Sequence, residues 1–195
     1  MNEDYKIIEG NKVHKTAIIN WKKLVIGKGN IFGPYSIIGT EAQWPGNKSF
    51  GEIIIGSNNH FREFTTVHLP TKKRGETKIG DKCYFMTMSH IGHDCVIENS
   101  VTLSNNVNVA GNTYIMKSSI LGLNAIIHQD QVIGSYAMIA MGTNIGKNVI
   151  VKPGYVYTGN PPRGIIKNNI GLKRNNITDD KLKKETIRFN KLKKK

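Results

Sequence analysis

The chain has 195 residues, a length that suits one domain with a single core. Apolar residues make up 38% of it and 20 residues are glycine, which favours a fold with many tight corners. Because no apolar run resembles a signal peptide or a membrane span, we expect a cytoplasmic protein without integral membrane association. The two cysteines, Cys83 and Cys95, match neither a disulfide framework nor a zinc motif, so we expect two buried thiols.

A six-residue period runs through most of the sequence. A large apolar residue keeps this spacing at Ile26, Phe32 and Ile38, and again over residues 55–67. It then recurs without a break at Ile79, Phe85, Ile91, Ile97, Leu103, Val109, Ile115, Leu121, Ile127, Ile133, Ile139, Ile145 and Val151. Since an α-helix needs apolar spacings of three and four, this period predicts short strands joined by corners, an all-β parallel β-helix of hexapeptide repeats.

Hexapeptide-repeat proteins, which this pattern resembles, wind three repeats into one turn of a left-handed triangular coil. Residues eighteen apart would then lie over one another at the usual strand spacing of about 4.8 Å. Glycine often follows the large apolar residue, as at Gly80, Gly92, Gly122, Gly134 and Gly146, and asparagine recurs nearby at Asn99, Asn106, Asn112, Asn124 and Asn148. We expect these residues to hold the positive φ angles of sharp corners.

Two excursions interrupt the period, at residues 40–52 and 69–76. The first contains Trp44, Pro45 and Gly46, and the second contains Lys72, Lys73 and Arg74. Loops that project from a regular scaffold often make substrate contacts. The period stops after Pro162, so we predict a β-helix domain over residues 1–163 and a C-terminal extension with one basic helix over residues 164–195.

The C-terminal tail is strongly basic. Ten Lys or Arg residues and three acids lie between Lys173 and Lys195, about half of the net charge of +14. Residues 178–195 read as one amphipathic helix, with Thr178 as a possible cap and with Leu182, Ile187 or Phe189, and Leu192 on its apolar side. Such a tail can attract nucleic acid, an anionic membrane or an acidic protein, or simply be a solvated helix end. Aromatic residues are not interleaved with the lysines, so we do not predict nucleic-acid binding.

The densest polar group within the repeats is the sequence SHIGHDC, which contains His93 and Asp94. His93 occupies a corner position of its hexapeptide and is expected to face outward. The triangular coil would place Gly111 one turn above it and Gln129 two turns above it, with Asn112 over Asp94. The sequence therefore predicts a polar column along one edge of the prism.

This column has the parts of an acyl-transfer site. A neutral imidazole can deprotonate a hydroxyl or amine near neutral pH, and Asp94 would orient it. A glycine beside such a base lets its backbone N–H approach and stabilise an oxyanion. Corner polar residues without catalytic role are one alternative. A metal site is another, but His90 and His93 are stacked under Asn108 and Gly111 rather than under further histidines, so no metal site is predicted.

From about Val13 to Arg174 the sequence resembles the acyl carrier protein-dependent UDP-N-acetylglucosamine O-acyltransferases, which catalyse the first acylation of lipid A synthesis. The segments that carry the resemblance are VHKTAII, NHFREFTTVH, SHIGHDCVIENSVTLSNNVNVAGN, IIHQDQVIG and GLKR. It implies catalytic roles for His93 as base, Asp94 as its partner and Gly111 as oxyanion donor. Substrate-binding roles are implied for His90, Asn112, His128, Gln129, Met141, Asn168 and Arg174. The family forms homotrimers with active sites between subunits.

The sequence also departs from this family. Asn112 replaces a histidine, and the QWPGN segment at residues 43–47 lacks the expected Asp and Lys, so nucleotide contacts must differ or be absent. Met141 stands where a glycine accepts longer chains, which implies a short to medium acyl group. The implied donor is an acyl carrier protein or coenzyme A thioester, with no permanently bound cofactor. A coenzyme A-dependent N-acyltransferase of a nucleotide amino sugar and a non-catalytic trimerising subunit are the alternatives.

Overall fold

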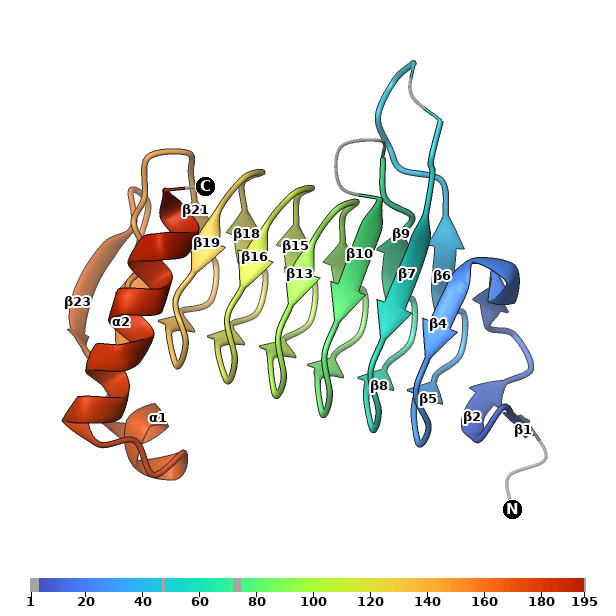
Figure 1. The fold of residues 1–195 in the computed structure, drawn as a ribbon, viewed down its shortest axis with the longest axis horizontal. Helices are drawn as coiled ribbons and strands as arrows, with labels where there is room; N and C mark the ends of the chain where they lie inside the picture. Colours follow the sequence, from blue (N-terminus) through green and yellow to red (C-terminus); the bar gives the residue numbers. More distant parts are fainter. Residues whose placement is uncertain (1–3, 47, 72–74, 195) are drawn as a thin grey trace.

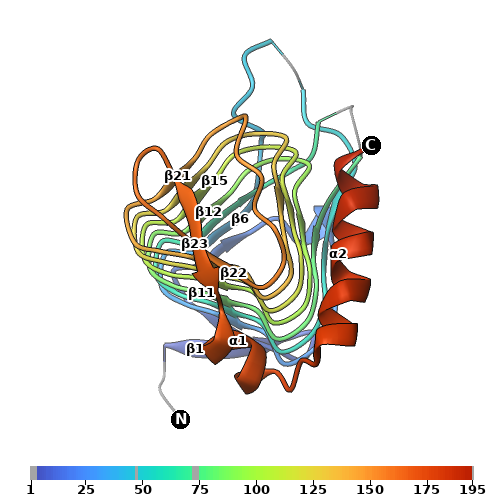
Figure 2. The same cartoon turned by 90° about the vertical axis from the view of Figure 1, so that its left-hand side faces the viewer.

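Each hexapeptide of the sequence folds as a short strand followed by a corner, and the strands stack into a left-handed parallel β-helix (Figure 1). The computed structural model describes residues 4–46, 48–71 and 75–194. Within these ranges the strands form three sheets, and the view along the prism shows their triangular outline (Figure 2). The expected fold class is confirmed.

Each of the three faces of the prism is formed by one sheet. Sheet A contains β1 (Tyr5–Ile8), β2 (Asn11–His14), β5 (Ile31–Phe32), β8 (His60–Phe61), β11 (Tyr84–Phe85), β14 (Thr102–Leu103), β17 (Ile120–Leu121), β20 (Met138–Ile139), β22 (Tyr155–Thr158) and β23 (Arg163–Lys167). Sheet B contains β3 (Ile18–Ile19), β6 (Ile37–Thr40), β9 (Thr66–His68), β12 (His90–Ile91), β15 (Asn108–Val109), β18 (Ile126–Ile127) and β21 (Asn144–Ile145). Sheet C contains β4 (Leu24–Ile26), β7 (Glu52–Ile55), β10 (Glu76–Ile79), β13 (Val96–Ile97), β16 (Tyr114–Ile115) and β19 (Val132–Ile133). A 3₁₀ turn, Trp21–Lys23, precedes β4.

The sequence period sets the register of these sheets. His90 pairs with Asn108 and Ile91 with Val109, which places residues eighteen apart over one another as expected. All of the large apolar residues from Ile79 to Val151 that follow the period are buried in the prism. Each such side chain contributes about 1.5–3 kcal/mol when it is fully buried. The core therefore consists of stacked columns of apolar side chains. The outward-facing residues between them are not needed for the core and can take part in binding or catalysis.

The prediction that the corner glycines hold positive φ angles is wrong. Gly80, Gly92, Gly122, Gly134 and Gly146 do not have positive φ, and neither do Asn99 and Asn148. Positive φ occurs instead at a later corner position, where Asn106, Asn112 and Asn124 do lie, together with side chains as large as Tyr136 and Met88. Most of these glycines serve close packing between turns. A Cβ on Gly134 would lie 2.3 Å from Pro153 N, and one on Gly122 would lie 2.7 Å from Met141 N.

Both excursions leave the prism at the corner between sheets B and C (Figure 1). The first connects β6 to β7, and the second connects β9 to β10. Lys72, Lys73 and Arg74 of the second lie outside the described residues. The bases of the two loops are joined, since Leu69 N donates to Thr40 O over 2.8 Å and Phe50 N donates to Pro70 O over 3.0 Å.

The C-terminal segment closes one end of the prism. Strand β23 returns antiparallel to β22 and continues across the boundary expected after residue 163. The periodic pattern does not predict the short helix α1 (Asn169–Arg174), which follows it. Helix α2 (Asp179–Lys193) is the expected basic helix, and its cap is Thr178, whose side chain accepts a hydrogen bond from Lys181 N. In the described part of the chain, helices long and apolar enough to cross a bilayer are absent.

Helix α2 lies along sheet C of its own chain (Figure 2). Its buried side chain is Phe189, which is 1% exposed, whereas Ile187 is 51% exposed. Next to Phe189, Arg188 forms a two-pronged ion pair with Glu98, and Tyr114 OH donates to the same carboxylate over 2.5 Å. The helix is thus held by one aromatic anchor and a charged network.

Candidate active site

His93 lies at the corner that follows β12, and its ring is held by a buried carboxylate. Its Nδ1 lies 2.7 Å from Asp94 Oδ2, which also accepts a hydrogen bond of 2.6 Å from Thr71 Oγ1. Thr77 Oγ1 accepts the Asp94 N–H over 3.0 Å and so fixes the backbone beneath it. A carboxylate at Nδ1 places the proton on that nitrogen. The lone pair of Nε2 is therefore available to take a proton.

Gly111 lies directly over this nitrogen. A Cβ built on Gly111 would be 2.4 Å from His93 Nε2, so the imidazole fills the space that another residue's side chain would occupy. Asn112 N donates to His93 O over 2.8 Å and locks the two turns together. No acceptor among the described residues binds the Gly111 N–H. A base and an open backbone donor thus lie side by side, as expected from the eighteen-residue stacking.

A cavity of about 340 Å³ opens in front of these two groups. Its lining comes from strands of sheet B, from the corners that follow them and from the first excursion: Gln43, Trp44, His68, His90, Gly92, His93, Asn108, Ala110, Gly111, Ile126, Ile127 and Gln129. Four predicted site residues, His90, His93, Gly111 and Gln129, are brought together here, and Asp94 supports them from behind. The cavity has polar groups at the base and isoleucines further along the prism, so it can hold a polar group beside an apolar chain.

Two more histidines border the cavity as neutral hydrogen-bonding groups. Burial, with smaller contributions from His68 and His93, lowers the pKa of His90 to about 4. Burial likewise lowers the pKa of His68, whose ring lies 4.7 Å from that of His90. His90 Nδ1 is 2.8 Å from Thr66 Oγ1. His68 was not among the predicted site residues. The sequence feature that could have identified it is its position at the end of the NHFREFTTVH segment, which carries part of the family resemblance.

Comparison with known proteins identifies the scaffold. An acyl-[acyl-carrier-protein]–UDP-N-acetylglucosamine O-acyltransferase from Synechocystis is 35% identical over 164 residues, which are 80% of this chain and 56% of that relative. The solved UDP-N-acetylglucosamine acyltransferase of Francisella novicida is 30% identical, with a TM-score of 0.72 over 93% of this chain and 75% of that one. The enzyme of that type from Bacteroides fragilis is 28% identical, with a TM-score of 0.83 over 91% of this chain and 69% of that one. No family model matches the sequence.

This chain belongs to the UDP-N-acetylglucosamine acyltransferase family. It spans little more than half the length of the Synechocystis relative. Both solved relatives match it over nearly all of its length. The family resemblance inferred from SHIGHDC and the neighbouring segments is confirmed.

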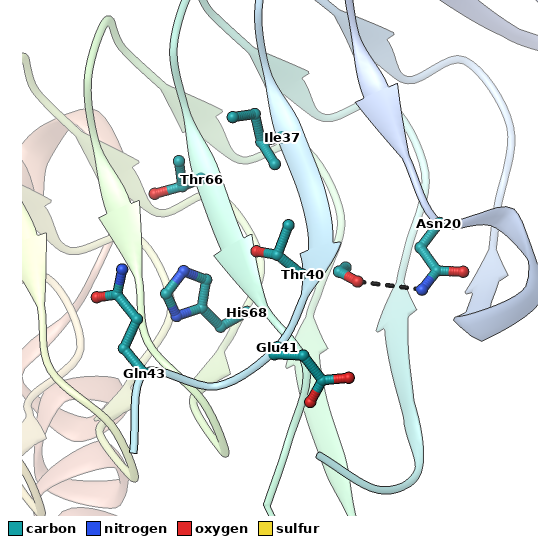
Figure 3. A pocket seen from close by; sticks show the side chains of 8 residues that line it. Asn20, Ile37, Thr40, Glu41, Gln43, Thr66 and His68 are labelled. Carbon is teal, nitrogen blue, oxygen red and sulfur yellow. Dashed lines mark hydrogen bonds between the residues drawn. The ribbon is translucent and has the colours of Figure 1, made fainter. Parts of the chain in front are cut away.

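A second, more open cavity extends the site of this acyltransferase family member toward its N-terminus (Figure 3). Its volume is about 630 Å³, and it is lined by Asn20, Ile37, Gly39, Thr40, Glu41, Gln43, Thr66 and His68. Gln43 and His68 border both cavities, and Figure 3 shows their side chains next to each other. The two cavities therefore adjoin along sheet B, and the N-terminal one has a largely polar lining.

Five predicted substrate-binding residues do not line the cavity around His93. Asn112 donates its amide to Asp130, and His128 is exposed with Nδ1 3.0 Å from Gln129 O. Met141 is 71% exposed. Asn168 caps α1 by accepting from Gly171 N over 3.0 Å and donates to Tyr136 O over 2.8 Å, while Arg174 is exposed at the end of that helix. Their roles in this family member stay predictions.

The described residues contain no cluster of three His, Cys, Asp or Glu side chains that could hold a metal ion. Cys83 and Cys95 are both buried, as expected. Burial raises the pKa of the Cys83 thiol to about 12, which keeps it protonated and unreactive near neutral pH.

Proposed function

We propose that this protein transfers an acyl group from a thioester to a nucleotide-linked amino sugar such as UDP-N-acetylglucosamine. The donor is an acyl carrier protein or coenzyme A thioester. One observation carries the proposal: His93 Nε2, oriented through Asp94, lies against the backbone of Gly111 at the base of a cavity. The substrate class is supported by the names of the relatives, which act on UDP-N-acetylglucosamine.

The reaction follows from these groups. His93 Nε2 takes the proton of the acceptor hydroxyl as the oxygen attacks the thioester carbonyl carbon. The Gly111 N–H stabilises the negative charge that develops on the carbonyl oxygen. When the tetrahedral intermediate collapses, the C–S bond breaks and the thiolate takes the proton back from Nε2. The proposed steps need the thioester donor, the His93 side chain and the Gly111 backbone N–H, and they use no metal or redox group.

The apolar end of the cavity is the proposed path of the acyl chain. Ile126 and Ile127 line it. The exposed side chain of Leu123 lies in the corner before Ile126, and that of Met141 lies in the corresponding corner one turn further along. We expect Met141 to limit the chain length, so that Met141→Gly shifts preference toward longer donors in a competition assay. If long donors already outcompete short ones and Met141→Gly changes nothing, this path is wrong.

A homotrimer is the proposed assembly, with each site completed by a neighbouring copy. The support is that Met141, Asn168 and Arg174 are not part of the cavity of their own chain, although the family resemblance implies that they bind substrate. Co-expression of His93→Ala and Arg174→Ala chains tests it. Mixed trimers would contain some sites with both residues intact and would recover part of the activity, whereas monomers with separate sites would recover none.

The deciding experiment incubates the wild-type protein with a panel of nucleotide sugars and thioesters, read by mass spectrometry. We expect a new acyl-sugar mass with UDP-N-acetylglucosamine and its loss in His93→Ala. Cleavage of the product by hydroxylamine distinguishes an ester from an amide. Unchanged turnover by His93→Ala, with the oligomer intact, would refute the mechanism. A cytoplasmic location stays a prediction.

A further inference from the structure

Trp44 covers the imidazole of His93 from outside the prism. Its ring lies 5.6 Å from the His93 ring, edge to face at 86°, and both side chains line the same cavity. The His93 side chain is 15% exposed, although it stands at a corner of the prism. Trp44 itself is 45% exposed, so one part of the indole faces solvent while another faces the base.

Hydrogen bonds hold the described residues around Trp44 in place. Ala42 is buried, and its N–H donates to Ser49 Oγ over 2.7 Å. Ser49 N donates in turn to Glu41 Oε2 over 3.0 Å, which closes a ring of hydrogen bonds across the loop. Trp44 N donates to Ala42 O over 2.8 Å. The indole is therefore held over His93 by its own backbone and by the anchored base of the loop.

A base that deprotonates a sugar hydroxyl will also deprotonate water. In that side reaction water, losing its proton to His93 Nε2, adds to the thioester carbonyl. The C–S bond then breaks, the thiolate takes the proton from Nε2, and the products are a free fatty acid and a thiol. An apolar ring that excludes water from the base suppresses such a reaction.

We infer that Trp44 is a specificity-determining residue that shields His93 from water and so directs the acyl group to the sugar rather than to hydrolysis. This inference rests on the proposed acyl transfer. It assigns Trp44 no part in proton transfer. The indole decides whether water or the sugar hydroxyl reaches His93. Its loss should therefore change the ratio of free acid to acyl-sugar while the fold is kept.

The first test measures that ratio. Wild type, Trp44→Ala and Trp44→Phe are incubated with acyl thioester and UDP-N-acetylglucosamine, and free fatty acid and acyl-sugar are quantified together. We expect a several-fold rise in the ratio of acid to acyl-sugar in Trp44→Ala and a ratio close to wild type in Trp44→Phe, which keeps an aromatic ring. Phe50→Ala is the matched control, because Phe50 is an exposed aromatic residue of the same loop that does not line the cavity.

The second test needs no turnover. Diethylpyrocarbonate modifies accessible imidazoles, and mass spectrometry reports the rate at each histidine. We expect faster modification of His93 in Trp44→Ala, with the exposed His128 unchanged as an internal reference. An unchanged rate at His93, or an unchanged product ratio in an active Trp44→Ala, overturns the inference. A wild type that acylates no sugar refutes the proposed function instead, and the modification rates still decide whether Trp44 is a shield.

Discussion

Substitution of Gly111 by alanine tests the site more sharply than removal of the base. The new Cβ would lie 2.4 Å from His93 Nε2 and 2.5 Å from Cε1, whereas ordinary contacts begin at 3.4 Å. The imidazole must therefore move by about 1 Å, and a displacement of that size costs on the order of 10²-fold in rate. The ring cannot move freely, because Nδ1 is held by Asp94 on one side and Trp44 lies against the ring. We expect kcat to fall by this factor while the fold persists, since Gly111 does not have positive φ.

Gly146→Ala is the matched control for this substitution. Gly146 lies in a corner at the same edge of the prism, directly after β21, has no positive φ, and would place its Cβ with nothing within 4 Å. Its kcat and unfolding temperature should equal those of the wild type. Steady-state kinetics with the best donor of the panel, with circular dichroism as a check of folding, provide the measurement. Wild-type kcat in Gly111→Ala would show that Nε2 does not need its place beneath this residue, and the proposed mechanism would be wrong.

Three further predictions concern the support of the site and of the C-terminal helix. Asp94→Asn should lower kcat on the order of 10³-fold, because His93 then loses the carboxylate that keeps its proton on Nδ1, and steady-state kinetics would show it. His90 has a pKa lowered from 6.5 to about 4, so its stabilising contribution is complete above pH 6.5 and is lost as pH falls toward 4. The unfolding temperature should fall over that window, and less steeply in His90→Gln. Phe189→Ala should cost about 3–5 kcal/mol of α2 docking and Ile187→Ala less than about 0.5 kcal/mol, as measured by hydrogen exchange of the helix.

The sequence predicted most of what the six-residue period controls. Because the period fixes which residues stack, the sequence alone places the neighbours of His93, and Gly111 lies where this stacking predicts. The same reasoning placed the large apolar residues in the core. It failed for the corner glycines, because composition cannot tell a residue that needs positive φ from one that needs to have no Cβ. The close approach of neighbouring turns, such as that of Gly134 and Pro153, shows that these glycines are needed because they have no Cβ.

Features outside the period were harder to predict. Trp44 and Gln43 lie on an excursion whose path depends on hydrogen bonds between its own residues, so nothing in the spacing indicated that they border the cavity. Helix α1 has six residues and depends on the cap from Asn168, which is too short a signal for a periodic pattern. Helix α2 was predicted, but its spacing left Ile187 and Phe189 equivalent. The packing against sheet C selects Phe189.

Both excursions from the repeat contribute residues to the surroundings of His93. The second excursion supplies Thr71, whose hydroxyl donates to the Asp94 carboxylate over 2.6 Å, while the first supplies Trp44 over the ring. A buried carboxylate is costly unless hydrogen bonds compensate its lost hydration, and a corner of a bare solenoid offers few donors. Regular repeats alone could stack His93 under Gly111 but could supply neither the Thr71 hydrogen bond to Asp94 nor the indole that covers the imidazole. The catalytic corner therefore requires the irregular loops as much as the regular coil, and both loops leave the prism at the edge where His93 lies.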